Sequence, residues 1–171
     1  MRLVAWLCVA AAAAFLAAPL RARAADTDRL SSLRLARMVF VDSHGGRNEL
    51  VLEAERVFLP AGTDVAQLEI VHVQLQKPEE LRGSFEMTCE RGELSLDSSD
   101  FRAEGNVRGN TGDGRQFFTS SAQYDSERGI VSTNAQVRIV DGVRTLMGQG
   151  FRYHVSDGRF VLTGGAQVVQ E

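Results

Sequence analysis

Histidine and cysteine are the residues of this chain best suited to metal binding, and their spacing argues against a metal site. His44, His72 and His154 lie far apart, and none belongs to an HxH, HxxxH or HExxH arrangement. Cys89 has no CxxC partner, and the other cysteine, Cys8, lies near the N-terminus. We therefore expect no metal ion and no other cofactor.

Nucleophilic and acid–base chemistry also lack a recognisable motif. The chain contains no GxSxG sequence, and its serine pairs at 98–99 and 120–121 have no characteristic partner. Glu53 and Glu55 fall at positions i and i+2, on one side of an extended strand. A glycosidase-like carboxylate pair is one interpretation of them, and a solvated outer face is the simpler one. The sequence predicts a protein that is not an enzyme.

The first 24 residues have the pattern of an export signal. A basic start at Arg2 precedes an uncharged run from Leu3 to Leu20, and Ala22-Arg23-Ala24 is a small-x-small cleavage site. Alanine dominates the run, which favours a cleaved signal peptide. An uncleaved membrane anchor is the alternative, because 18 uncharged residues can reach across a bilayer. Under either interpretation, the remainder of the chain is exported.

Charge and cysteine content narrow the classes of partner. Removing residues 1–24 takes away Arg2, Arg21 and Arg23 and no acidic residue, which leaves 16 basic and 22 acidic side chains. This acidic balance is the opposite of what nucleic acid binding needs, so we expect no nucleic acid partner. Cys89 is then the only cysteine, and a single thiol forms no internal disulfide. Its apolar neighbours indicate a buried strand position.

A weak repeat with a period near 30 residues organises the exported part. An apolar or aromatic residue is followed 13 to 16 residues later by a valine, which is typical of stacked β-hairpins. The pairs are Val57 and Val73, Leu94 and Val107, Tyr124 and Val137, and Tyr153 and Val168. The pentapeptide at 133–137 recurs at 164–168 and, more loosely, at 103–107. Gly129 and Gly158 each follow a tyrosine by five residues, which predicts a strand, a turn and another strand.

Apolar alternation predicts strands along the rest of the chain, with one change of phase. Between Leu68 and Leu75 the apolar set shifts by one residue, which predicts a bend at Ile70-Val71. A turn is expected at Arg91-Gly92-Glu93. The predicted organisation is a signal peptide or anchor over 1–24, a linker over 25–37 and one β domain over 38–171.

Strand phase also predicts which side chains face the interior of that domain. The interior is either filled by the protein's own side chains, which is the default for a domain of this size, or open as a slot for an apolar ligand. The predicted inner residues are Phe85, Met87, Phe101, Tyr124, Val137, Ile139, Phe151, Tyr153, Phe160 and Leu162.

In the order of these features the chain resembles the LptC family, the periplasmic component of the bacterial lipopolysaccharide export machine. The stretches that carry the resemblance are 50–57, 85–96, 101–107, 117–125 and 146–153. The resemblance implies an all-β fold: an open β-jelly roll built from repeated antiparallel hairpins, preceded by the N-terminal hydrophobic segment. It favours the open slot, with the inner residues above as the lipid-binding surface.

The resemblance also implies a function and partners. The domain would accept the acyl chains of lipopolysaccharide from an inner-membrane ABC transporter, and would pass them along a periplasmic bridge toward the outer membrane. Strand edges would join it to the next jelly roll of the bridge. Members of the family keep an N-terminal membrane anchor, whereas this leader looks cleavable. The alternatives are therefore the soluble bridge protein of the same pathway, or a packed β scaffold that only joins partners edge to edge.

Overall fold

The computed structural model describes residues 32–44, 48–76 and 84–170, and these residues form strands and turns without a helix. The N-terminal hydrophobic segment of the expected fold lies outside them. The strands are β1 (Leu33–Leu35), β2 (Met38–His44), β3 (Asn48–Leu59), β4 (Val65–Gln76), β5 (Phe85–Ser95), β6 (Phe101–Thr111), β7 (Gln116–Asp125), β8 (Ile130–Asp141), β9 (Arg144–His154), β10 (Arg159–Leu162) and β11 (Gln167–Gln170).

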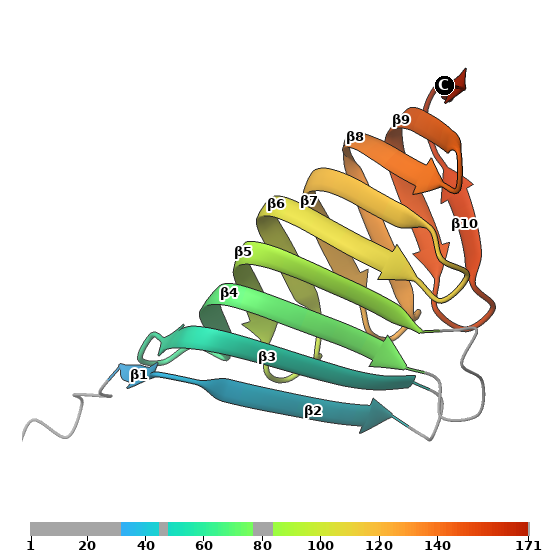
Figure 1. Ribbon diagram of the computed structural model, residues 1–171. Helices are drawn as coiled ribbons and strands as arrows, with labels where there is room; N and C mark the ends of the chain where they lie inside the picture. The colour runs from blue at the N-terminus through green and yellow to red at the C-terminus, as the bar shows by residue number, and fades with distance from the viewer. Residues whose placement is uncertain (1–31, 45–47, 77–83, 171) are drawn as a thin grey trace, which may run out of the picture.

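All strands belong to one antiparallel sheet in which sequence neighbours from β3 to β9 are also neighbours in space. At one end both β1 and β2 pair with β3, and at the other end both β10 and β11 pair with β9. The strands therefore stack in order along one axis, as the colour gradient of Figure 1 shows. The predicted open jelly roll of repeated hairpins is confirmed.

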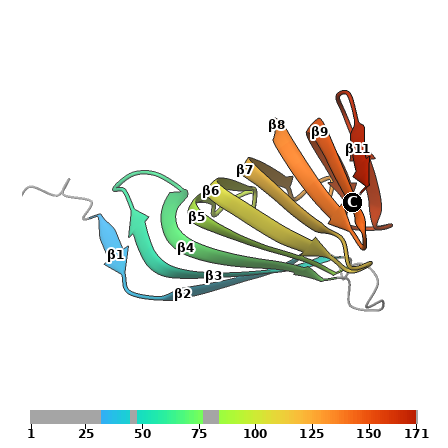
Figure 2. The same cartoon turned by 45° about the horizontal axis from the view of Figure 1, so that its top comes forward.

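Each long strand bends near its middle, so the sheet folds into two faces. The first face contains β2, 48–54, 71–76, 85–89, 107–111, 116–119, 136–141, 144–149 and β11. The second face contains β1, 56–59, 65–69, 91–95, 101–104, 121–125, 130–133, 151–154 and β10. We call the line of bends the corner, and the opposite side, where the hairpin turns lie, the seam. Figure 2 shows the same bends from a second direction.

The corner is built by residues that interrupt the ladders. Register shifts occur between Thr88 and Arg91 on β5 and between Glu104 and Val107 on β6, and later strands repeat them. Ile70 has φ +53°, in the left-handed region, which confirms the bend predicted at Ile70-Val71. On β5 the buried positions change phase in the same way, from Cys89 to Gly92.

The repeated pentapeptides mark the corner. The copies at 103–107 and 133–137 span the interruptions in β6 and β8, and the copy at 164–168 begins between β10 and β11. There the chain passes from the second face to the first. Gly105 and Asn106 both have positive φ, at +77° and +47°, which lets β6 turn sharply. Each copy of the repeat therefore marks a point where the chain passes from one face of the sheet to the other.

The turns agree with the sequence in two places and differ in one. Gly129 and Gly158 have φ values of +62° and +68° in the β7–β8 and β9–β10 turns, as predicted. Arg91-Gly92-Glu93 was expected to be a turn but lies within β5. A Cβ atom on Gly92 would come within 2.5 Å of the Phe101 ring, so this glycine makes room for an aromatic side chain. The expected linker 25–37 contributes β1 to the sheet.

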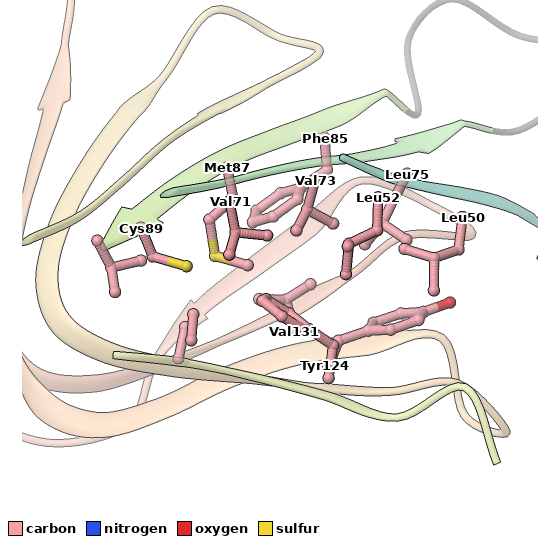
Figure 3. Packing of buried hydrophobic residues seen from close by; sticks show 14 of the residues in the cluster. Leu50, Leu52, Val71, Val73, Leu75, Phe85, Met87, Cys89, Tyr124 and Val131 are labelled. Carbon is pink, nitrogen blue, oxygen red and sulfur yellow. The ribbon is translucent and has the colours of Figure 1, made fainter. Parts of the chain in front are cut away.

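The hydrophobic core lies between the two faces. Figure 3 shows Leu52, Val73 and Phe85 on one side of it and Tyr124 and Val131 on the other. Side chains from β3 to β9 contribute to one continuous cluster, so the core extends along the whole stack.

Candidate functional site

Four of the six predicted inner residues of the second face form a single row across the sheet. The register pairs Phe101 with Tyr124, Tyr124 with Val131, Val131 with Tyr153, and Tyr153 with Phe160. Because directly paired residues project from the same side of a sheet, the row presents one surface to the interior. Phe151 and Leu162 pair with each other one step nearer the corner.

The predicted inner residues of the first face lie opposite this row. Met87 pairs with Gly109, Gly109 with Phe117, and Phe117 with Ile139. Phe85 lies one step nearer the seam, and Val137 lies one step nearer the corner. Eight of the ten predicted side chains are buried, and Phe160 and Leu162 are half-buried against the same core.

Aromatic rings connect the two faces. Phe85 on the first face stacks on Tyr153 of the second, with ring centroids 5.2 Å apart. Phe117 meets Phe151 across the interior at 5.1 Å, and Phe151 stacks on Phe160 at 5.0 Å. The sequence interpretation omitted Phe117, although this ring joins the cluster through both Phe85 and Phe151.

The interior of this structure is filled by its own side chains. Leu52, Val73, Phe85, Val131 and Phe151 are all 0 % exposed, so neighbouring atoms cover them completely. The open slot favoured by the family resemblance is therefore not the state shown here. Ring contacts near 5 Å leave no separation between the two faces in which an acyl chain could lie.

Polar contacts between hairpin turns run along each face. On the second face the Leu96 amide donates to the Asp64 carbonyl (2.8 Å), the Ser126 amide to the Asp100 carboxylate (2.9 Å), and the Val155 amide to the Gly129 carbonyl (2.9 Å). On the first face Arg115 of the β6–β7 turn and Asp141 at the end of β8 form an ion pair (3.4 Å). These lateral contacts hold neighbouring turns together within a face.

Three ionisable side chains in the interior are held in their neutral forms. Burial raises the pKa of Tyr124 to about 12, and Asp42 and Asp100 add to the effect. Burial also raises the pKa of Tyr153, with a further contribution from Asp113. The pKa of the Cys89 thiol is raised by burial to about 11, so this thiol is protonated at neutral pH and is a poor nucleophile.

The residues considered as candidates for enzymatic or metal chemistry do not come together in a site. Glu53 and Glu55 are exposed on the outer side of β3. Within the described ranges, no group of three or more histidine, cysteine or acidic side chains is placed to hold a metal ion. The same part of the chain contains no helix long and apolar enough to cross a membrane.

Both ends of the sheet offer strand edges on both faces. The N-terminal edge consists of β1 on the second face and β2 on the first, and the C-terminal edge consists of β10 and β11 in the same arrangement. No strand among the described residues pairs with the outer side of these four strands. Leu33, Val39 and Val41 are exposed apolar side chains at the N-terminal edge, and Val161 is one at the C-terminal edge.

A groove of about 400 Å³ lies at the N-terminal edge of the second face, beside β1, β3 and β4. Leu35 of β1 and Phe58 of β3 line it, and Arg34 lies over the Phe58 ring at 5.0 Å. Arg56 and Glu69, an ion pair at 2.5 Å, border the same groove. This edge therefore offers apolar and charged contacts beside its unpaired backbone groups.

Comparison with known proteins adds a family and a fold. The family model described as "Lipopolysaccharide-assembly, LptC-related" matches residues 3–171. A search of curated proteins gives no match. The crystal structure of LptH from Pseudomonas aeruginosa, described as the LptA-homologous periplasmic component of the conserved lipopolysaccharide transport device, superposes with a TM-score of 0.54. It is 13 % identical in sequence, and the alignment covers 71 % of this chain and 94 % of LptH.

Proposed function

Because this chain belongs to the LptC family of lipopolysaccharide-assembly proteins, we propose that it is a non-enzymatic periplasmic protein that binds lipopolysaccharide and transfers it. It accepts the lipid from an inner-membrane ABC transporter. It passes the lipid along a periplasmic bridge toward the outer membrane. The acyl chains bind between the two faces of the jelly roll.

The continuous apolar interior is the observation that supports this proposal. The inner row of the second face runs from Ala66 through Leu94, Phe101 and Tyr124 to Phe160 without a charged side chain. A row that crosses the sheet from β4 to β10 gives a lipid an uninterrupted apolar path along these strands. Acyl chains gain about 25 cal/mol for each Å² of surface removed from water.

Lipid entry requires the two faces to separate at the seam. Side-chain packing across the interior, as between Phe85 and Tyr153, holds them together there. Acyl chains that enter between the faces replace these contacts with equally apolar ones, so the exchange has a small net free energy. The lateral hydrogen bonds between turns, such as Asp64 with Leu96, preserve each face while the seam opens.

The two edges are the docking points for partners. Each edge carries one strand on each face, so a partner sheet that pairs with it continues both faces and therefore the apolar path. One edge receives the transporter's periplasmic part and the other receives the jelly roll of the bridge. The N-terminal segment tethers the domain to the inner membrane in this proposal. The family match beginning at residue 3, within that segment, supports the tether.

Site-specific photo-crosslinking in cells tests lipid binding. A photoreactive phenylalanine analogue at Tyr153 should capture lipopolysaccharide. The same analogue at Arg152, the exposed neighbour on the outer side of β9, should not. Equal capture at the two positions, or none at Tyr153 in protein of normal abundance, would contradict lipid binding between the faces.

A packed scaffold that only joins partners through its edges is the second candidate. The filled interior favours it, because Phe85 and Phe151 have no exposed surface. The scaffold predicts that Tyr153 captures no lipid while the edges still capture proteins.

Photoreactive groups at Val41 and Val161 test the edges, since both side chains are exposed at opposite ends of the stack. Transfer along a bridge predicts that the two positions capture two different partner proteins. Capture of one and the same partner at both positions would contradict this arrangement.

A further inference from the structure

The interior contains two tyrosine hydroxyls that no described residue contacts by a hydrogen bond. Tyr124 is 4 % exposed and Tyr153 is 1 % exposed, and they are the only tyrosines of the chain. By contrast, the buried Thr133 hydroxyl accepts a hydrogen bond from the Ala135 amide (3.0 Å), and Thr111 donates to the Arg115 carbonyl (3.3 Å). Buried tyrosine hydroxyls usually have a partner, and a hydroxyl without one destabilises the folded state.

Both hydroxyls have equivalent positions in the sheet. Tyr124 and Tyr153 each pair with Val131, so they lie in one row and two strands apart, at about 10 Å. Figure 3 shows the Tyr124 hydroxyl pointing away from Cys89, which lies beside the corner, and toward the side where Leu50 lies. The Tyr124 hydroxyl therefore points toward the seam.

Charged groups of the first face lie near both rings. The charge of Asp42 on β2 raises the pKa of Tyr124. Asp113 of the β6–β7 turn raises the pKa of Tyr153, and Arg115 of the same turn lowers it. Asp157 of the β9–β10 turn also raises the pKa of Tyr153. The tyrosine row is therefore the level at which the apolar interior gives way to the polar turns of the seam. Tyrosine suits such a boundary because its ring is apolar and its tip is polar.

We propose that the Tyr124 and Tyr153 hydroxyls set the depth of a bound lipid by hydrogen-bonding its hydroxyl, ester or amide groups where the acyl chains meet the saccharide. This inference rests on the proposed lipid binding. The chains lie on the corner side of the row, among residues such as Phe151, and the saccharide lies on the seam side. Ligand binding then gives each hydroxyl a hydrogen-bond partner, which no residue of the described ranges supplies.

Binding measurements on the full chain test this role. Tyr124→Phe and Tyr153→Phe keep both rings and remove only the oxygens. Each should weaken binding of purified lipopolysaccharide about fivefold, equivalent to about 1 kcal/mol. Binding of decylpyrene, an apolar chain without polar groups, should be unchanged. Thr133→Val is the matched control, because it removes a buried hydroxyl whose partner lies within the protein. It should not weaken lipopolysaccharide binding, although Thr133 pairs with Phe151 beside the acyl chains.

Two further readouts separate a hydrogen-bonding role from a packing role. With ¹³Cζ-labelled tyrosine the chain gives two signals, and lipopolysaccharide should shift both while decylpyrene shifts neither. The free Tyr→Phe variants should be at least as thermally stable as wild type, since they lose a buried hydroxyl that makes no hydrogen bond to the described part of the chain. Unchanged lipopolysaccharide affinity, equal weakening for both probes or a lower melting temperature would overturn the inference. Failure of the wild-type protein to bind lipopolysaccharide would instead overturn the proposed function.

Discussion

The rings of Phe85 and Tyr153 stack across the interior with their centroids 5.2 Å apart. Phe85 begins β5 on the first face, and Tyr153 lies on β9 of the second face. The strands continue through the corner and join the two faces there, whereas this pair joins them by side-chain packing. The stacked rings therefore help to hold the free protein in its closed form.

Truncation of Phe85 should be strongly destabilising. Phe85→Ala removes a fully buried ring that contacts Phe117 and Tyr153, and should lower the free energy of unfolding by about 3–5 kcal/mol. Phe118→Ala is the control, because Phe118 is half-buried on the outer side of β7 under Arg138. Phe118→Ala should lower the free energy of unfolding much less than Phe85→Ala. Urea denaturation measures both, and similar losses would contradict the closed core.

Gly109 tests how closely the aromatic cluster approaches the backbone. A Cβ atom at this position would lie 2.2 Å from the Phe117 ring and 2.6 Å from the backbone carbonyl of Glu86. Gly109→Ala should therefore destabilise the protein by about 1–3 kcal/mol. At Gly165 a Cβ meets no atom within 4 Å, so Gly165→Ala should change stability by less than about 0.5 kcal/mol. Thermal melts of the two variants distinguish them.

Ile70 shows that the corner imposes backbone strain. Its φ of +53° is unfavourable for a β-branched residue, and its side chain is half exposed, so little burial offsets the strain. Ile70→Gly should raise the free energy of unfolding by about 1 kcal/mol.

Val161→Gly is the matched control for this substitution. Val161 is exposed to a similar degree, but it lies within β10 in ordinary extended geometry, so glycine there should be destabilising. A loss of stability at Ile70 comparable to that at Val161 would show that the bend is not strained.

Sequence periodicity predicted the hairpins well because strand phase and turn chemistry are local properties. Gly129 and Gly158 lie in the expected turns, and the change of phase at Ile70 marks a true bend. Gly92 misled the interpretation, because a glycine that accommodates the Phe101 ring has the same local signal as a turn glycine. That distinction depends on a neighbouring strand.

The corner explains why the inner surface was only partly predicted. Counting by twos back from Tyr124 selects Phe118 as an inner residue. The register shift between β7 and β8 instead turns Phe117 inward and leaves Phe118 outside against Arg138. The local sequence pattern also does not predict that the interior is closed, because closure depends on how side chains of the two faces fill the space between them. Lipid contact at the inner residues stays a prediction.

Alkaline pH should weaken the fold through Tyr124. An unfolded tyrosine loses its proton near pH 10, whereas burial raises the pKa of Tyr124 to about 12 in the folded protein. The folded state therefore retains the proton more tightly, and the stabilisation is complete below pH 10 and is lost between pH 10 and pH 12. For one such group the free energy of unfolding falls by up to about 1.4 kcal/mol per pH unit in that range.

Urea titrations between pH 8 and pH 11 should show this fall in wild type and a shallower one in Tyr124→Phe. Cys89, whose pKa burial raises to about 11, adds a decline of comparable size that begins near pH 9 and occurs in both proteins. Identical slopes in the two proteins would show that the Tyr124 hydroxyl is hydrated rather than buried.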